Sequence, residues 1–176
     1  MSKNSDLLDS VKNNDMQNFR SIVKSTSIEK IKGDVIYLAA ELNHRKYIEI
    51  LMEYGVSIDT KIEDDWRRNP TALITAILED NLKATKLLLD MGANIDAGND
   101  KNATPLFLAV LRKNTESTKL LVDYSANIDV MTDDGWTPIS LVEARISGEL
   151  EIYGSKSIAR KIRNILLQNK WWQFWK

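Results

Sequence analysis

The sequence predicts an all-α solenoid of about five stacked helix–turn–helix units, and two observations predict this fold class. First, Thr71, Thr104 and Thr137 stand 33 residues apart, and each opens a similar phrase, such as Thr-Pro-Leu-Phe-Leu-Ala from position 104. Second, the word Ala-Asn-Ile-Asp recurs with the same period, at 93–96 and at 126–129. A fixed period of this length is typical of helical hairpins that bury their apolar faces only by stacking on their neighbours.

The units can be placed along the chain from these repeated phrases. In the first unit Leu7, Leu8 and Val11 share one helical face, and Asp15 stands where it can cap the next helix, so we interpret this unit as an atypical terminal repeat. We expect one domain at 1–170, with an N-terminal cap at 1–32, units at 33–68, 69–101 and 102–134, a divergent C-terminal repeat at 135–170, and an aromatic, cationic tail at 171–176.

Helix starts and ends carry residues suited to those places. Each repeated threonine precedes an apolar run, where its hydroxyl can cap a helix, and the proline that follows Thr104 and Thr137 has a preset φ for the first turn. Gly55 and Gly92 follow the second helices, where a left-handed residue ends a helix at low cost. Ser125 replaces this glycine in the fourth unit, which predicts a strained or differently shaped turn there.

Two segments depart from the period. The interval from Gly55 to Gly92 is four residues longer than the repeat, and the surplus lies in 61–68, which predicts an elongated loop. In the fifth unit the leucine pair arrives thirteen residues late, at 166–167, which indicates either an inserted loop or a lengthened helix pair. The last helix is expected to place its apolar stripe on Ile158, Ile162, Ile165 and Leu166.

The period and the repeated words resemble the ankyrin repeat, over roughly residues 5–145 and most closely from Asn69 to Pro138. The resemblance implies that the loops between units are hairpin-like fingers at right angles to the helices. It also implies that the fingers and the first helix of each pair line a concave binding face. A non-catalytic scaffold that binds a partner protein is the function it implies.

Composition and charge narrow the class of protein. The 176 residues carry a formal net charge of −1, but the stretch from Ile152 onward has no acid and six positive charges, which leaves −7 on the rest. There is no cysteine, so disulfides and thiolate metal sites are excluded. No apolar run marks a secretory signal or a membrane span. We expect a cytoplasmic monomer, and heavy use of Asn, Lys and Ile suggests delivery into a host cell by an intracellular bacterium.

Motifs for catalysis or metal binding are missing from the sequence. There is no glycine-rich phosphate loop, nucleophile elbow or kinase signature, so no enzyme and no cofactor is predicted. The single histidine, His44, lacks a second ligand, and we expect it to make a structural hydrogen bond at the start of a helix. The acidic pairs at 64–65 and 133–134 lack the alternating ligands of a calcium loop.

Partner contacts are expected at the finger tips and on the first helices behind them. Trp66 in the elongated finger is the sharpest indication, because tryptophan and arginine most often anchor interfaces. Packing of Trp66 on an adjacent finger is an equal alternative, and Trp136 also has a structural alternative. The candidate partner-binding residues are Trp66, Arg67, Arg68, Glu79, Lys101, Arg112, Asp133, Trp136 and Arg145.

The C-terminal tail places four large aromatic side chains between Lys170 and Lys176. Three interpretations stay open: the tail caps the end of the array, enters a membrane interface where tryptophan and lysine are both favoured, or is a linear motif for another protein. A nucleic acid is not the expected partner, because there is no repeated stacking platform. The tail candidates are Trp171, Trp172, Phe174 and Trp175.

Overall fold

The computed structural model describes residues 3–63, 68–147 and 156–173, with side chains described as far as Gln168. Within these ranges the regular structure is helical, apart from one isolated antiparallel bridge between Lys61 and Thr71. The predicted all-α repeat fold is therefore confirmed. The chain divides into two compact units, residues 1–94 and residues 95–176, which we call the N-terminal unit and the C-terminal unit and describe separately.

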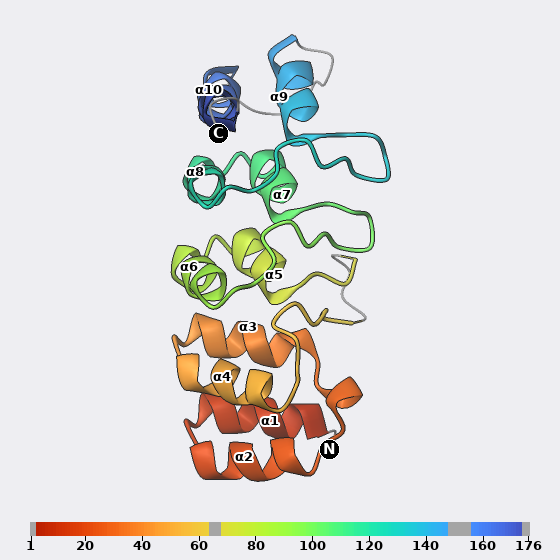
Figure 1. The fold of residues 1–176 in the computed structure, drawn as a ribbon, viewed down its shortest axis with the longest axis vertical. Helices are drawn as coiled ribbons and strands as arrows, with labels where there is room; N and C mark the ends of the chain where they lie inside the picture. Colours follow the sequence, from red (N-terminus) through yellow and green to blue (C-terminus); the bar gives the residue numbers. More distant parts are fainter. Residues whose placement is uncertain (1–2, 64–67, 148–155, 174–176) are drawn as a thin grey trace. The chain divides into compact units, whose positions relative to one another are not determined.

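The N-terminal unit contains three helix pairs (Figure 1). The first helices of successive pairs pack on one another, α1 on α3 and α3 on α5, and the second helices α2 and α4 also touch. The loop that follows each pair extends to one side of the helices, as expected of fingers. The elements are α1 (Lys3–Lys12), α2 (Met16–Lys24), a short 3-10 helix (Ile28–Lys30), α3 (Gly33–Glu41), α4 (Arg45–Glu53), α5 (Ala72–Leu78) and α6 (Leu82–Asp90).

The C-terminal unit repeats this arrangement with two helix pairs. The first helices α7 and α9 pack on one another, and α10 packs on both α8 and α9. The elements are α7 (Pro105–Leu111), α8 (Thr115–Asp123), α9 (Pro138–Ser147) and α10 (Lys156–Gln173).

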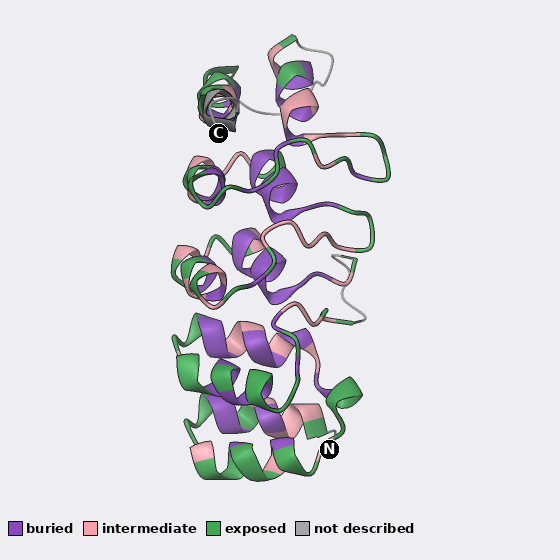
Figure 2. Cartoon of the chain, in the orientation of Figure 1, coloured by how far each residue is buried: buried purple, intermediate pink, exposed green. Residues whose placement is uncertain are grey.

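The first helices form the interior of each unit. Six of the seven residues of α5, and likewise of α7, are buried, so both appear almost entirely purple in Figure 2. Of the leucine pairs on the second helices, at 87–88 and 120–121, Leu88 and Leu121 are buried, whereas Leu87 and Leu120 are only partly buried. Adjacent helical residues point about 100° apart, so only one member of each pair faces the core.

The predicted caps are present. The hydroxyls of Thr71, Thr104 and Thr137 each accept a hydrogen bond from the backbone N–H three residues later, at 3.2, 3.2 and 3.1 Å. The second helices α6 and α8 begin in a similar way. The side-chain oxygens of Asn81 and Asn114 each accept a hydrogen bond from the backbone N–H three residues later, at 3.0 and 2.8 Å. These bonds satisfy backbone donors that a helix start leaves without an intrahelical partner.

His44 does not make the hydrogen bond expected of it. It stands at the start of α4, where α2, α6 and α8 have Asp or Asn, but its side chain makes no cap bond. Its ring instead stacks on Tyr47, with ring centroids 5.4 Å apart, and its buried Nδ1 has no hydrogen-bond partner among the described residues. The prediction for His44 was therefore wrong in its chemistry, because its ring lies against the ring face of Tyr47, whose hydroxyl donates to Asn14 Oδ1 at 3.1 Å.

The start of α3 lacks the repeated threonine and is capped by another helix. The backbone N–H of Lys32 donates to Asn4 Oδ1 at 3.1 Å, and Asn4 Nδ2 lies 3.0 Å from each carboxylate oxygen of Asp34. A side chain of α1 thus replaces the local cap and ties the terminal repeat to the next one.

The Ile-Asp dipeptides that follow the helix pairs, at 58–59 and 95–96, connect neighbouring repeats. Asp59 Oδ1 accepts from the backbone N–H of Asn94 at 3.0 Å within the N-terminal unit, and Asp96 Oδ1 accepts from that of Asn127 at 2.9 Å within the C-terminal unit. In both cases the aspartate of one repeat satisfies the loop backbone of the following repeat. The sequence analysis placed these words at the finger entrances but did not predict this bond.

Asp59 makes the stability of the protein depend on pH. Burial raises the pKa of its carboxyl above 3.8, while the Asn94 N–H partly opposes this rise. Between 3.8, the pKa of the unfolded carboxyl, and the higher pKa of the folded one, the folded chain keeps a proton that the unfolded chain has lost. The contribution of Asp59 to stability is therefore fully present below pH 3.8 and is lost as pH rises through the folded pKa. In Asp59→Asn, which keeps an oxygen acceptor for Asn94, we expect this fall to be absent. Urea unfolding of both proteins from pH 3.5 to 7 checks it, and a constant difference in free energy would contradict it.

The turn at Ser125 has the same left-handed conformation as the glycine turns. Its φ is +67°, compared with +87° at both Gly55 and Gly92. Because a side chain in this region is unfavourable, we expect Ser125→Gly to raise the free energy of unfolding by about 0.5 kcal/mol, after the entropy cost of glycine is included. The reverse exchange, Gly92→Ser, should lower it. Chemical denaturation of both variants tests the pair, and a loss of stability in Ser125→Gly would contradict the argument.

The last unit differs in two ways from the predicted form. The buried stripe of α10 runs through Ala159, Ile162 and Leu166, whereas Ile158 is 38% exposed. Helix α10 continues to Gln173, so the backbones of Trp171 and Trp172 belong to it. Phe174 and Trp175 lie outside the described residues, as do positions 148–155, where the lengthened connection was expected.

Candidate functional site

One finger of the C-terminal unit spans residues 98–103 and is organised by Asn99. Its side-chain Oδ1 accepts hydrogen bonds from the backbone N–H groups of Lys101 and Ala103, at 3.0 and 3.1 Å. Its own N–H donates to the Ala103 carbonyl at 3.2 Å. A single amide side chain therefore fixes the bend that presents Lys101.

The next finger spans residues 131–136 and is organised by Thr132. The Thr132 N–H donates to the Trp136 carbonyl at 2.9 Å, and the Trp136 N–H donates back to Thr132 Oγ1 at 3.1 Å. Gly135 closes the bend with φ +82°, a value that favours glycine. Because Thr132 is buried, the hairpin is held from within.

These two fingers are bonded to each other. The Asp133 N–H donates to the Lys101 carbonyl at 3.1 Å, and Asn102 Nδ2 donates to the Met131 carbonyl at 2.7 Å. We call residues 98–103 and 131–136 together the finger pair. Its backbone is fixed by hydrogen bonds within and between the loops, so side chains at its tip are presented from a preformed surface.

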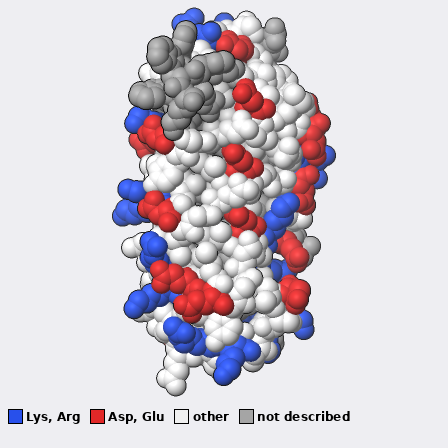
Figure 3. Space-filling model, viewed as in Figure 1, with Lys and Arg blue, Asp and Glu red and all other residues white. Residues whose placement is uncertain are grey.

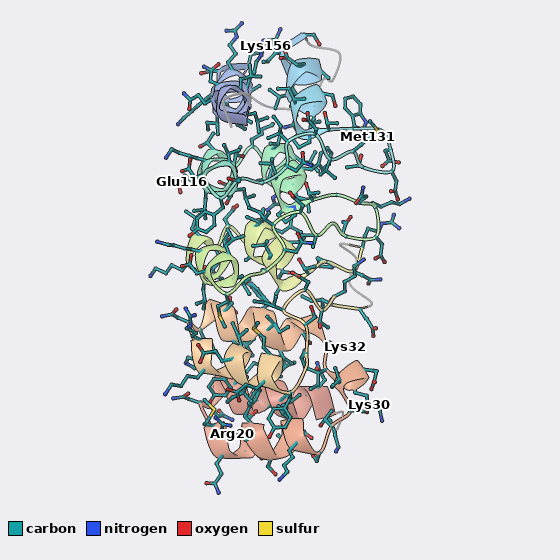
Figure 4. The ribbon with its side chains drawn as sticks, in the orientation of Figure 1. Arg20, Lys30, Lys32, Glu116, Met131 and Lys156 are labelled. Carbon is teal, nitrogen blue, oxygen red and sulfur yellow. The ribbon has the colours of Figure 1, made fainter. Side chains whose placement is uncertain are left out.

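The finger pair brings together three predicted residues and one that sequence reasoning missed. Lys101 and Asp133 are exposed and Trp136 is partly buried. Met131, which is labelled on this loop in Figure 4, is 55% exposed, more than any other large hydrophobic residue of the described chain. An apolar residue directly before the polar run Thr132-Asp133-Asp134 of a finger was the available signal for Met131. The combination of an apolar side chain with one cation and one anion suits a protein surface.

The other finger candidates belong to the N-terminal unit. Arg68 is exposed and has φ +68°, in a finger that is closed by the Ile62 N–H donating to the Pro70 carbonyl at 2.8 Å. Trp66 and Arg67 lie outside the described residues, so their predicted contacts stay predictions.

Glu79 and Arg112 are exposed but stand apart from the fingers. They are the residues at which α5 and α7 end, whereas the fingers enter those helices at their other ends. A helix of seven residues spans about 10 Å. Within each unit the helix candidate is therefore separated from the finger tips by the length of a first helix.

Arg145 is not available to a partner, which corrects its prediction. It is 8% exposed, and its guanidinium donates to the carbonyls of Val110 and Leu111 at 2.8 and 3.0 Å, which are the last residues of α7. Burial lowers its pKa. Arg145 thus satisfies carbonyls that the end of α7 leaves without helical partners, and its positive charge suits that end of the helix.

The charge pattern and the described side chains give little support to a nucleic-acid site, a metal site or a membrane-spanning segment. Figure 3 shows acidic and basic side chains mixed on the face it draws, without the broad positive field there that attracts nucleic acid. Among the described residues, no group of three or more His, Asp or Glu side chains is placed to hold a metal ion. In the part of the chain that is described, no helix combines the length and apolar character needed to cross a membrane.

Stacked helical hairpins with bonded fingers define a repeat scaffold that works through its surface. A family model for ankyrin repeats in three copies matches residues 7–99, and a single ankyrin-repeat model matches residues 101–133. The chain belongs to the ankyrin-repeat family, whose members are generally protein–protein interaction modules and typically non-catalytic scaffolds. Comparison with curated proteins gave no match.

Proposed function

We propose that this protein is a non-catalytic scaffold that binds a partner protein through the finger pair, with Lys101, Met131, Asp133 and Trp136 at the centre of the contact. The observation that supports this most is the bonding of one finger to the other, by Asp133 N–H to the Lys101 carbonyl and by Asn102 to the Met131 carbonyl. A surface that is ordered before binding loses little conformational entropy when a partner docks.

Each side chain has a separate part in this proposal. Met131 is flexible and polarisable, so it can fill an apolar pocket of irregular shape. Lys101 and Asp133 carry opposite charges at the rim, where charge complementarity favours one partner orientation over others. Stable interfaces cover about 800 Å² on each partner, so the contact extends beyond these four residues.

Site-specific photocrosslinking tests the proposal. A benzophenone amino acid at Met131 should crosslink a discrete partner protein in extracts of the source cells. The same group at Ile158, an exposed residue on α10 of the same unit, serves as the matched control and should not. The captured partner should then bind Met131→Asp at least about tenfold more weakly than wild type, because an apolar contact is replaced by a charge. Equal crosslinking at both positions would contradict the proposal.

A second candidate function is peripheral attachment to a membrane through α10 and the tail. The observation that favours it is a set of exposed cations on α10, namely Lys156, Arg160 and Lys161. Cationic residues next to tryptophan favour an anionic membrane surface. Flotation with anionic vesicles should recover the full chain but not a chain ending at Asn169, and equal recovery of the two would remove this candidate.

A further inference from the structure

We propose that a groove of the N-terminal unit, between α6 on one side and the end of α3 together with α4 on the other, binds an amphipathic helix of a partner protein, aligned parallel to α6. Two adjoining hollows, of about 510 and 390 Å³, make up this groove, and Asp90 lines both of them. The groove involves none of the residues of the finger pair, so this inference goes beyond the proposed function and does not depend on it.

The floor of the groove is apolar. Leu42 and Met52 are 40% and 41% exposed, and they line the first and the second hollow respectively. Leu87 of α6 lines the first hollow and Met91, the residue that ends α6, lines the second; they stand four residues apart and both are partly buried. Apolar side chains on both walls give a partner helix something to cover, and methionine adapts to different apolar surfaces.

The charges at the rim are separated along the groove. Lys83 and Lys86 line the first hollow, which begins at the N-terminal end of α6. Glu49 and Glu53 line the second, together with the shared Asp90. Glu41 and the shared Asp90 balance the two lysines of the first hollow, whereas in the second hollow Arg45, paired with Glu49 at 2.9 Å, is the one cation beside three acids. The groove therefore becomes more acidic from the first hollow to the second.

This polarity selects the chemistry and direction of the partner helix. An acidic N-terminal half would lie beside Lys83 and Lys86, and a basic C-terminal half beside Glu49 and Glu53. The same distribution suits the helix itself, because acids near the N-terminus and bases near the C-terminus complement its dipole. Such a helix needs apolar residues spaced at i, i+4 and i+7 to reach the four floor residues.

A designed peptide tests the inference on the full chain. The probe is an alanine-rich, fluorescein-labelled helix of about 16 residues, roughly 24 Å long, with a leucine stripe, glutamates in its first half and lysines in its second half. The control peptide has the same composition and stripe with the two charged halves exchanged. Fluorescence anisotropy should show saturable binding of the probe, and binding at least about tenfold weaker for the exchanged peptide.

Variants locate the binding site. Lys83→Glu/Lys86→Glu should weaken binding of the probe at least about tenfold and bring its affinity close to that of the exchanged peptide. Met52→Asp should abolish saturable binding, and NMR signals of the Met52 and Met91 methyl groups should shift when the probe binds wild type. Thermal unfolding of both variants verifies that they fold, because all three substituted residues are exposed.

Three outcomes would overturn the inference. They are equal affinity for the two peptides, unchanged binding to a folded Lys83→Glu/Lys86→Glu variant, and methyl shifts that spare Met52 and Met91. Concentration-dependent self-association that Met52→Asp removes would also overturn it, because the groove would then be occupied by a second copy of this chain. The photocrosslinking at Met131 reports on the finger pair alone, so failure of one proposal leaves the other distinguishable.

Discussion

Replacement of Arg145 by methionine is expected to lower the free energy of unfolding by about 2–3 kcal/mol, because the carbonyls of Val110 and Leu111 lose their side-chain donors at the end of α7. Methionine has a similar length and fills much of the same space, so the loss reports on hydrogen bonding more than on a cavity. Removal of a desolvated charge offsets part of the cost, since burial already lowers the pKa of Arg145. Urea denaturation followed by circular dichroism measures the change.

Two further variants separate the causes of this effect. Arg145→Lys keeps the charge but has one ammonium group for two carbonyls, so we expect an intermediate loss of about 1 kcal/mol. Arg112→Met, at the exposed end of α7, should change stability by no more than about 0.5 kcal/mol. If Arg145→Met and Arg112→Met lower the free energy of unfolding by the same small amount, Arg145 has no structural role. The predicted contact of Arg145 with a partner protein would then have to be considered again.

Gly33→Ala is expected to cost about 2–3 kcal/mol, although alanine is normally the better helix former, because its methyl group would overpack the start of α3. A Cβ on Gly33 would overlap the backbone carbonyl of Thr60, which enters the elongated finger. The Gly33 N–H also donates to the Lys61 carbonyl at 3.2 Å, and Lys61 forms the bridge to Thr71. The backbone of the finger base therefore cannot move away without breaking these contacts.

Gly92→Ala is the matched control for this steric argument. Nothing lies within 4 Å of a Cβ at Gly92, but φ there is +87°, so only conformational strain of about 1 kcal/mol is expected. Thermal and urea unfolding should therefore rank Gly33→Ala as the more damaging exchange. A stabilised Gly33→Ala variant would show that the close approach of α3 to Thr60 does not limit the fold.

The parts of the fold that could be predicted from sequence depend on local chemistry. A hydroxyl or amide at Thr71, Thr104 and Asn81 caps the helix that follows it, and Gly55 and Gly92 take the left-handed conformation that their positions require. Each of these features is decided within a few residues of chain. The repeat makes them visible because the same residue type returns at the same place.

The parts of the fold that could not be predicted depend on contacts between residues far apart in the sequence, or on the absence of a residue that ends a helix. Arg145 stands eight residues after its threonine, as Glu79 and Arg112 do, but α5 and α7 end there while α9 continues to Ser147. After the other two ends come Asp80 and Lys113 with φ +54° and +60°, whereas Ile146 is β-branched and disfavours that conformation. The helix therefore continues, and the arginine turns inward to reach α7.

In the candidate site, too, the features set by local sequence could be predicted and those set by contacts between distant residues could not. Lys101, Asp133 and Trp136 were predicted because the repeat places them in fingers. The hydrogen bonds between the two fingers, and hence the placement of Met131 beside those residues, arise from contacts between loops about 30 positions apart in the chain. No local pattern encodes such a contact.

The most direct test of the central claim is the affinity of the captured partner for the charge exchange Lys101→Glu/Asp133→Lys. Both side chains are exposed, so thermal unfolding should stay unchanged. If the finger pair is the docking surface, the dissociation constant measured by isothermal titration calorimetry rises at least about tenfold, because like charges then face each other across the interface. A dissociation constant equal to that of the wild type would contradict the claim that this partner docks on the finger pair.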